Sequence, residues 1–173
     1  MKKTDFLGFN VQGITKNRGD YMNDQTIIIM IGIQGSGKST FCNKFLGNYK
    51  RINLDTLKTR HREQTEIDEC FKTGESFVVD NTNPTKEERA RYISQAKTEG
   101  YKVVGYFMES KIKDCIDRNN KRTGNACVPA KAIAATSNKL QLPRYDEGFD
   151  QLYFVKNDGT EMTVYKWRDE NEI

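Results

Sequence analysis

The sequence predicts an α/β fold built on a parallel sheet of about five strands, with helices covering both faces. Two features predict it. Short runs of β-branched and aromatic residues alternate with longer polar segments that carry helix signals, and this alternation implies parallel strands joined by helical crossovers. The first run, residues 26–31, has the dense apolar character of a strand that is buried on both faces. Ligands of such sheets bind at the carboxyl ends of the strands.

The predicted strands are short and each is bounded by turn residues. The final run, residues 162–167, follows the turn Asn157-Asp158-Gly159 and should form a hairpin with the strand before it. The main strands are expected at residues 26–31, 49–54, 77–79, 101–108 and 152–155.

The predicted helices begin at capping signals, and several end at a glycine. Pro84 opens one helix, Ser110 is expected to cap the next, and Pro129 begins the last. The helices are expected at residues 38–46, 56–72, 85–98, 110–122 and 129–140.

The length of 173 residues suits one domain, which we expect over residues 26–173 after an irregular leader at 1–25 with a strand around 6–11. The net charge of +4 is compatible with a phosphate-bearing partner. No run is apolar for long enough to span a membrane, and the N-terminus lacks the apolar stretch of a signal peptide. The cysteines have no zinc or disulfide spacing, which predicts free thiols in a soluble, cytoplasmic protein; they are Cys42, Cys70, Cys115 and Cys127.

The segment from Gly32 to Ser39 fits the pattern GxxxxGK[ST], between a buried strand and a helix. Glycines let successive backbone N–H groups turn inward around an anion, and the helix adds the partial positive charge of its N-terminus. The motif predicts a P-loop NTPase or kinase fold that binds ATP with Mg²⁺. The expected nucleotide contacts are Gly32, Gln34, Gly35, Ser36, Gly37, Lys38, Ser39 and Thr40. Lys38 should reach the β- and γ-phosphates, and the Ser39 hydroxyl should ligate the metal.

Two carboxylates follow the ends of predicted strands. Asp80 ends a buried strand and is the candidate acidic partner of the metal, or else it caps the turn with Asn81. Asp55 ends the strand after the P-loop helix. It is a candidate general base for an incoming hydroxyl, or else the N-cap of the next helix.

Arg118 and Arg122 lie four residues apart, so a helix places both guanidinium groups on one face. Such a pair could form a mobile lid that covers the charge developing on the γ-phosphate. The alternative is a solvated basic face that the helix dipole favours. Lys38, Asp55, Arg118 and Arg122 are the candidate catalytic residues.

Together these motifs resemble the 5′-hydroxyl polynucleotide kinase family, over roughly residues 26 to 156. The residues that carry the resemblance are Asn53-x-Asp55-Thr56, Val79-Asp80-Asn81-Thr82-Asn83-Pro84, Glu88-Arg89-x-Arg91-Tyr92, Arg118-Asn119-Asn120-Lys121-Arg122 with Val128-Pro129, and Glu147-Gly148-Phe149. The P-loop is shared with many other families, whereas the segment at residues 80–84 and the position of Asp55 are far more specific.

The resemblance implies that Asp55 activates the 5′-hydroxyl of a DNA or RNA acceptor, while Arg122 and Arg118 clamp the donor phosphates. It also places Lys58 and Thr82, with Asn83, toward the acceptor. Two positions depart from the pattern. Leu54 stands where members of this family often carry a basic residue, and Lys58 stands where the bacteriophage member has arginine. Lysine keeps the charge but loses the bidentate fork.

Relatives of this kind can carry a phosphatase domain with a DxDGT motif. The segment Lys156-Asn157-Asp158-Gly159-Thr160 lacks the first aspartate and is predicted to be a hairpin turn, so we expect no phosphatase domain. Separate ligase or phosphatase partners are compatible with this interpretation, and the oligomeric state is left open.

Two other functions fit the same motifs. One is a kinase for a small molecule or another acceptor that is not a polynucleotide. The aromatic residues that could stack on bases are Phe71, Tyr92 and Tyr145, and each could equally pack in the core. The other is a nucleotide-dependent switch, which would need the P-loop but would tolerate Asp55→Asn.

Overall fold

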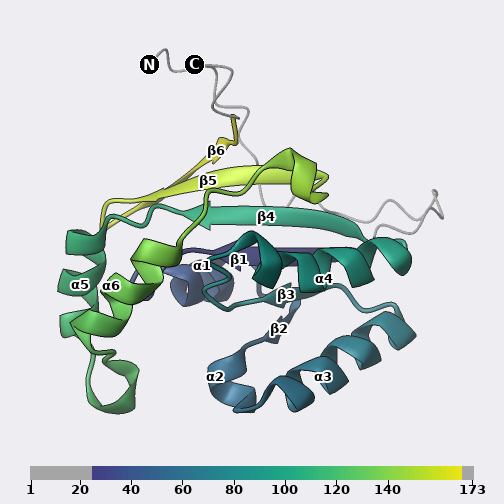
Figure 1. The fold of residues 1–173 in the computed structure, drawn as a ribbon, viewed down its shortest axis with the longest axis horizontal. Coiled ribbons are helices and arrows are strands. Elements are labelled where there is room, and N and C mark those ends of the chain that lie inside the picture. The colour runs from purple at the N-terminus through teal and green to yellow at the C-terminus, as the bar shows by residue number, and fades with distance from the viewer. Residues whose placement is uncertain (1–24, 169–173) are drawn as a thin grey trace.

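A computed structural model describes residues 25–168, except for the side chain of Asn125. These residues form one six-stranded sheet in the order β2-β3-β1-β4-β5-β6 (Figure 1). Strands β1 to β5 pair in parallel, and β6 pairs antiparallel with β5 as the predicted hairpin. The strands are β1 Thr26–Ile31, β2 Lys50–Ile52, β3 Phe77–Val79, β4 Lys102–Met108, β5 Gln151–Asn157 and β6 Met162–Lys166. The strand predicted around residues 6–11 lies outside the described residues.

The helices follow the strands in the predicted alternation. They are α1 Lys38–Phe45, α2 Leu54–Leu57, α3 Arg60–Thr73, α4 Lys86–Thr98, α5 Ile112–Asn120 and α6 Ala130–Lys139, with the 3-10 turns η2 Gly124–Ala126 and η3 Tyr145–Glu147. Thr59 and Thr85 cap α3 and α4 by accepting a backbone N–H on their hydroxyls. Within residues 25–168, no helix combines the length and the apolar character needed to cross a membrane.

The helix predicted at residues 56–72 is wrong in one respect, because the structure divides it into α2 and α3. Lys58 breaks the helix with a φ of 71°. Asn53 starts α2 by accepting the Thr56 N–H on its side chain, so Asn53 is the N-cap that was considered for Asp55. The division places Asp55 in the first turn of a separate short helix directly after β2.

Ser110 is a second correction. It does not cap α5, which begins at Ile112. Its hydroxyl instead accepts the Ile33 N–H at 3.2 Å and donates to the Met108 carbonyl at 2.8 Å. The side chain expected to start a helix therefore ties the end of β4 to the phosphate loop.

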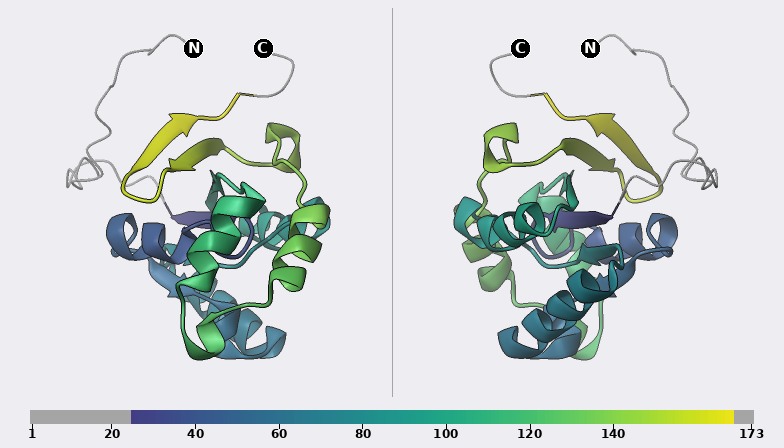
Figure 2. Two further views of the ribbon diagram at one scale, coloured as in Figure 1. Left: turned by 90° about the vertical axis from the view of Figure 1, so that its left-hand side faces the viewer. Right: turned by 90° about the vertical axis from the view of Figure 1, so that its right-hand side faces the viewer.

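Alternate residues of β1 face two separate apolar layers. Ile27 and Ile29 pack in the larger core, which includes Ile67 of α3 and Ile93 of α4. Ile28 packs in the second core, which α1 covers from the other face. Figure 2 shows α1 and α4 on opposite sides of the sheet. The predicted α/β fold with helices on both faces is confirmed.

A buried arginine ties the segment after β3 to the segment after α6. Arg89 is completely buried and forms two hydrogen bonds to the Glu147 carboxylate, at 2.7 and 2.8 Å. Its remaining terminal nitrogen donates to the carbonyls of Asn83, Pro84 and Gln141. This arrangement fixes the chain at both ends of the region that carries α5 and α6.

We expect Arg89→Met to lower the free energy of unfolding by about 3–5 kcal/mol, because it leaves the buried Glu147 carboxylate without its charged partner, with only the Arg144 N–H still bonded to it. Lys97→Met is the matched control, since the Lys97–Asp150 pair is 40% exposed on both sides and should contribute less than about 1 kcal/mol. Urea unfolding of both variants checks this. Equal losses in the two variants would contradict the assignment.

Candidate active site

The predicted site residues gather at the carboxyl ends of the parallel strands. The P-loop follows β1, Asp55 follows β2, and Asp80 follows β3. The region containing Arg118 follows β4. These ends lie on the left of Figure 1, where α5 and α6 stand beside the edge of the sheet. Segments far apart in the sequence therefore meet where a parallel sheet binds its ligands.

In the P-loop, several backbone N–H groups have no hydrogen-bond partner among the described residues, whereas several backbone carbonyls accept hydrogen bonds from side chains. Within residues 25–168, the backbone N–H groups of Gly35, Gly37 and Lys38 make no hydrogen bond. By contrast, the Gly35 carbonyl accepts from Arg118 Nε at 2.8 Å, and the Ser36 carbonyl accepts from Asn157 Nδ2 at 3.0 Å. α1 also begins without a side-chain cap. Such a row of inward N–H groups at a helix N-terminus suits a phosphate.

Gly37 shows how closely the end of β5 approaches this loop. Its φ is 101°, and a Cβ at this position would lie 2.5 Å from Asn157 Nδ2 and 2.9 Å from Met162 Cε. The hairpin between β5 and β6 thus packs directly on the phosphate loop. Asn157 was missed in the sequence because nothing in the turn Asn157-Asp158-Gly159 points to a contact 121 residues away.

Lys38 is buried and its ammonium turns back on the loop. It donates to the carbonyls of Gly32 at 2.9 Å and Ile33 at 2.8 Å. The pKa of Lys38 is lowered to about 8, mainly by burial; the charge of Arg122 also lowers it, while Asp80 opposes the shift. A phosphate placed here would replace the carbonyls as partner and favour the charged form.

Ser39 and Asp80 meet as expected of a metal pair. Ser39 Oγ donates to Asp80 Oδ2 at 2.9 Å. The Asp80 side chain is 1% exposed, and its other oxygen, Oδ1, is buried without a hydrogen-bond partner among the described residues. An unpaired buried carboxylate oxygen beside a hydroxyl matches the oxygen ligands that Mg²⁺ prefers. The residues present therefore fit the metal.

Arg51 is a site residue that the sequence analysis missed. Its Nε and Nη2 both donate to Asp80 Oδ2, at 2.8 and 2.5 Å. A charged residue inside the predicted strand at 49–54, just before the buried Ile52, was the available signal. Strand pairing supplies the contact, because β2 and β3 lie side by side with Arg51 in register with Val78.

The predicted arginine lid corresponds to α5, η2 and α6. Arg118 contacts the P-loop, as described above, whereas Arg122 is exposed just beyond α5. On α6, Thr136 accepts a hydrogen bond from Gln34 of the P-loop at 3.1 Å. Buried Asn119 closes the connecting segment through reciprocal bonds with Val128, at 2.7 and 2.9 Å. Both helices of the lid thus rest on the phosphate loop.

Asp55 is exposed on α2, and its carboxylate makes no hydrogen bond or ion pair within residues 25–168. The backbone next to Asp55 is fixed by a hydrogen bond to Asn81, which Glu63 supports in turn. The Leu54 N–H donates to Asn81 Oδ1 at 2.9 Å, and Asn81 Nδ2 donates to Glu63 Oε1 at 2.5 Å. Buried Glu63 also accepts from Tyr92 OH at 3.2 Å. The carboxylate of Asp55 is therefore free while its backbone is fixed.

The other expected acceptor residues are placed differently from one another. Lys58 is exposed and lies just after α2, before the start of α3. Thr82 contributes its carbonyl, which accepts the Gly32 N–H at 3.0 Å. Asn83 is 3% exposed, and its Nδ2 donates to the Met30 carbonyl at 2.7 Å, so its amide is committed to the end of β1.

The aromatic candidates for base stacking lie in or against the core. Tyr92 is 5% exposed, and Phe71 and Tyr145 pack against the same cluster. Phe71 makes an edge contact with the Tyr101 ring at 4.8 Å between centroids. Core packing, the alternative given for these residues, is what the structure records.

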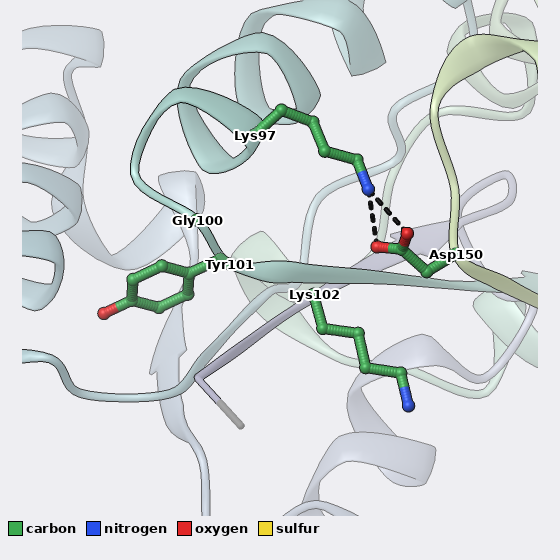
Figure 3. A pocket seen from close by; sticks show the side chains of 5 residues that line it. All are labelled: Lys97, Gly100, Tyr101, Lys102 and Asp150. Carbon is green, nitrogen blue, oxygen red and sulfur yellow. Dashed lines mark hydrogen bonds and ion pairs between the residues drawn. The ribbon is translucent and has the colours of Figure 1, made fainter. Parts of the chain in front are cut away.

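A shallow, open depression of about 500 Å³ lies at the opposite end of the strands. Figure 3 shows it beside the start of β4, where Lys97 Nζ bonds both oxygens of Asp150. Its lining residues are Lys97, Gly100, Tyr101, Lys102 and Asp150. None of them belongs to the predicted site, and the depression lies at the amino end of β4, away from the P-loop.

We expect ATP affinity to fall about tenfold between pH 7 and pH 9 because the free site has Lys38 with a pKa of about 8, and bound phosphates favour its charged form. The affinity is thus almost fully present at pH 7 and below, and it falls as the pH rises through 8. Titration of a fluorescent ATP analogue at each pH measures this.

Lys38→Met should bind weakly at every pH and lose the dependence. Lys44→Met, which removes an exposed lysine from the same helix, should keep the wild-type profile. A wild-type affinity that stays constant from pH 7 to pH 9 would contradict the role given to Lys38.

Comparison with known proteins places this site in a family. A family model described as an AAA domain matches residues 27–143. A "Putative bifunctional polynucleotide phosphatase/kinase" of Acanthamoeba polyphaga mimivirus is 34% identical, with the match covering 75% of this chain and 32% of that protein. The bifunctional polynucleotide phosphatase/kinase of Schizosaccharomyces pombe is 30% identical, over 74% of this chain and 33% of its own length. The chain thus spans about a third of the length of these curated relatives.

Solved structures agree on the fold. A gluconokinase from Sinorhizobium meliloti 1021 superposes with a TM-score of 0.54 at 20% identity, covering 77% of this chain and 83% of that one. A likeness at this identity supports the architecture alone. The family model covers more than half of the chain and includes the P-loop, Asp55, Asp80 and both lid arginines. The chain therefore belongs to the AAA domain family of P-loop kinase domains.

Proposed function

We propose that the chain transfers the γ-phosphate of ATP to the 5′-hydroxyl end of DNA or RNA. The observation that carries this proposal is the position of Asp55. Its unpaired carboxylate stands on the strand end next to Asp80, at the same edge of the sheet as the P-loop. A general base at that edge is what a hydroxyl acceptor requires. The names of the two polynucleotide phosphatase/kinase relatives support the choice of a nucleic-acid acceptor.

The donor side would be held by the loop. The free N–H groups of Gly35, Gly37 and Lys38 would bind phosphate oxygens, and the Lys38 ammonium would leave its carbonyl partners for the β- and γ-phosphates. Ser39 and Asp80 would hold Mg²⁺, which supplies charge neutralisation on the phosphates. Arg118 and Arg122 would cover the γ-phosphate from the lid.

The acceptor side would supply the proton transfer. The 5′-hydroxyl would give its proton to the Asp55 carboxylate as its oxygen forms a bond to the γ-phosphorus. The bond from that phosphorus to the bridging oxygen breaks, and ADP leaves with the electron pair. Lys58 would attract the acceptor's phosphates as an exposed point charge. The protein thus contributes position and charge rather than a covalent intermediate.

We expect label from γ-labelled ATP to appear on 5′-hydroxyl DNA or RNA oligonucleotides and not on 5′-phosphorylated ones. Asp55→Asn should reduce the rate at least about a hundredfold, because it removes the base but keeps the side chain's size. Binding of the ATP analogue should change less than about threefold, since none of the proposed donor contacts involves Asp55.

Glu69→Gln is the control, because it also removes one carboxylate, exposed on α3, and should leave transfer unchanged. Label on a small-molecule acceptor alone would replace the polynucleotide proposal with the small-molecule kinase. Bound ATP with no transfer to any acceptor, and full tolerance of Asp55→Asn, would favour a nucleotide switch instead.

A further inference from the structure

The guanidinium of Arg51 is bonded to the Asp80 carboxylate, at the expected metal site. The Arg51 guanidinium donates two hydrogen bonds to a single oxygen of Asp80, Oδ2, and the Ser39 hydroxyl donates a third. Arg51 reaches this position from β2, with its side chain 36% exposed, and also donates to Asn43 Oδ1 at 3.3 Å. Asp80 Oδ2 therefore has three donors from two elements of the fold.

The second oxygen of the same carboxylate is in the opposite situation. Asp80 Oδ1 is buried and accepts nothing from residues 25–168. A buried carboxylate oxygen without a partner is costly, so its persistence indicates a ligand that completes it. Asp80 Oδ1 is therefore available to bind a metal, whereas Oδ2 is already bonded to Arg51 and Ser39.

The charges at this point favour a cation only when phosphates are present. Lys38 is buried close enough for Asp80 to influence its pKa, and Arg51 pairs directly with Asp80. These three side chains together carry a net positive charge. Arginine stays protonated at any ordinary pH, so its repulsion of a divalent ion cannot be relieved by losing a proton. A nucleotide would bring several negative charges to the same place.

We propose that Arg51 acts as a counter-cation for Asp80 that keeps divalent metal out of the nucleotide-free site, so that the metal enters together with the nucleotide. This rests on the Mg²⁺ site of the proposed function, but not on the identity of the acceptor. Arg51 holds Oδ2, leaves Oδ1 for the metal or its water, and repels a metal ion that arrives alone.

Binding of Mn²⁺ to the full chain tests this, with free Mn²⁺ followed by electron paramagnetic resonance. Without nucleotide, Arg51→Met should bind Mn²⁺ at least about tenfold more tightly than the wild type, because a neutral side chain removes the repulsion. With ADP present, the two proteins should differ by less than about threefold, because the phosphates then dominate the local charge.

Matched variants separate charge from packing. Arg51→Lys keeps the charge and should stay within about threefold of the wild type without nucleotide. Arg51→Gln is a second neutral variant and should behave like Arg51→Met. The double variant Arg51→Met with Asp80→Asn should lose the gain, since the gain depends on the Asp80 carboxylate. Thermal unfolding identifies any variant that fails to fold, and the remaining neutral variant then carries the comparison.

Three results would overturn the proposal. The first is tight Mn²⁺ binding by the wild type without nucleotide. The second is no gain in either neutral variant. If Asp80→Asn binds Mn²⁺ with ADP as well as the wild type does, the metal assignment itself fails and the proposal with it. None of these measurements uses an acceptor, so a failure of the polynucleotide assignment would be seen separately, in the transfer assay.

Discussion

The backbone N–H groups of the phosphate loop have to stay free for an anion, and much of the surrounding structure follows from that constraint. A loop with unused donors would collapse onto its own carbonyls unless other groups occupied them. Here Lys38, Arg118 and Asn157 donate to those carbonyls from within the loop, from the lid and from β5. The Ser110 hydroxyl accepts the Ile33 N–H of the same loop. Parts of the chain more than a hundred residues apart therefore serve one short turn.

Charge balance is the second constraint on this site. Burial of Lys38 and Asp80 is tolerable because each has partners, yet those partners are the ones that a nucleotide and a metal would displace or share. Arg51 adds a positive charge at the same carboxylate. The site thus suits a ligand that carries both negative phosphates and a cation, which is the composition of Mg·ATP.

On the proposed acceptor side, the side-chain amides of Asn53 and Asn81 connect neighbouring segments by bonding to their backbone groups. Asn53 caps α2, while its own amide donates to the Asp80 carbonyl, and Asn81 accepts the Leu54 N–H. The segment that carries Asp55 is thereby fastened to the segment that carries Asp80. Glu63 and Tyr92 support Asn81 from α3 and α4. The distance between the proposed base and the proposed metal site is set by these neighbouring strand ends.

The amino-acid sequence was sufficient to predict the α/β alternation, the P-loop and the order of the strand-end carboxylates, because local patterns of apolar residues and glycines specify strands, helices and turns. It did not place the break at Lys58, where the chain adopts a positive φ, nor the true partner of Ser110. The contacts of Arg51 and Asn157 also came only from the tertiary structure. Those contacts depend on which strands lie side by side and on which side chains meet across the sheet. A local stretch of sequence predicts neither of these.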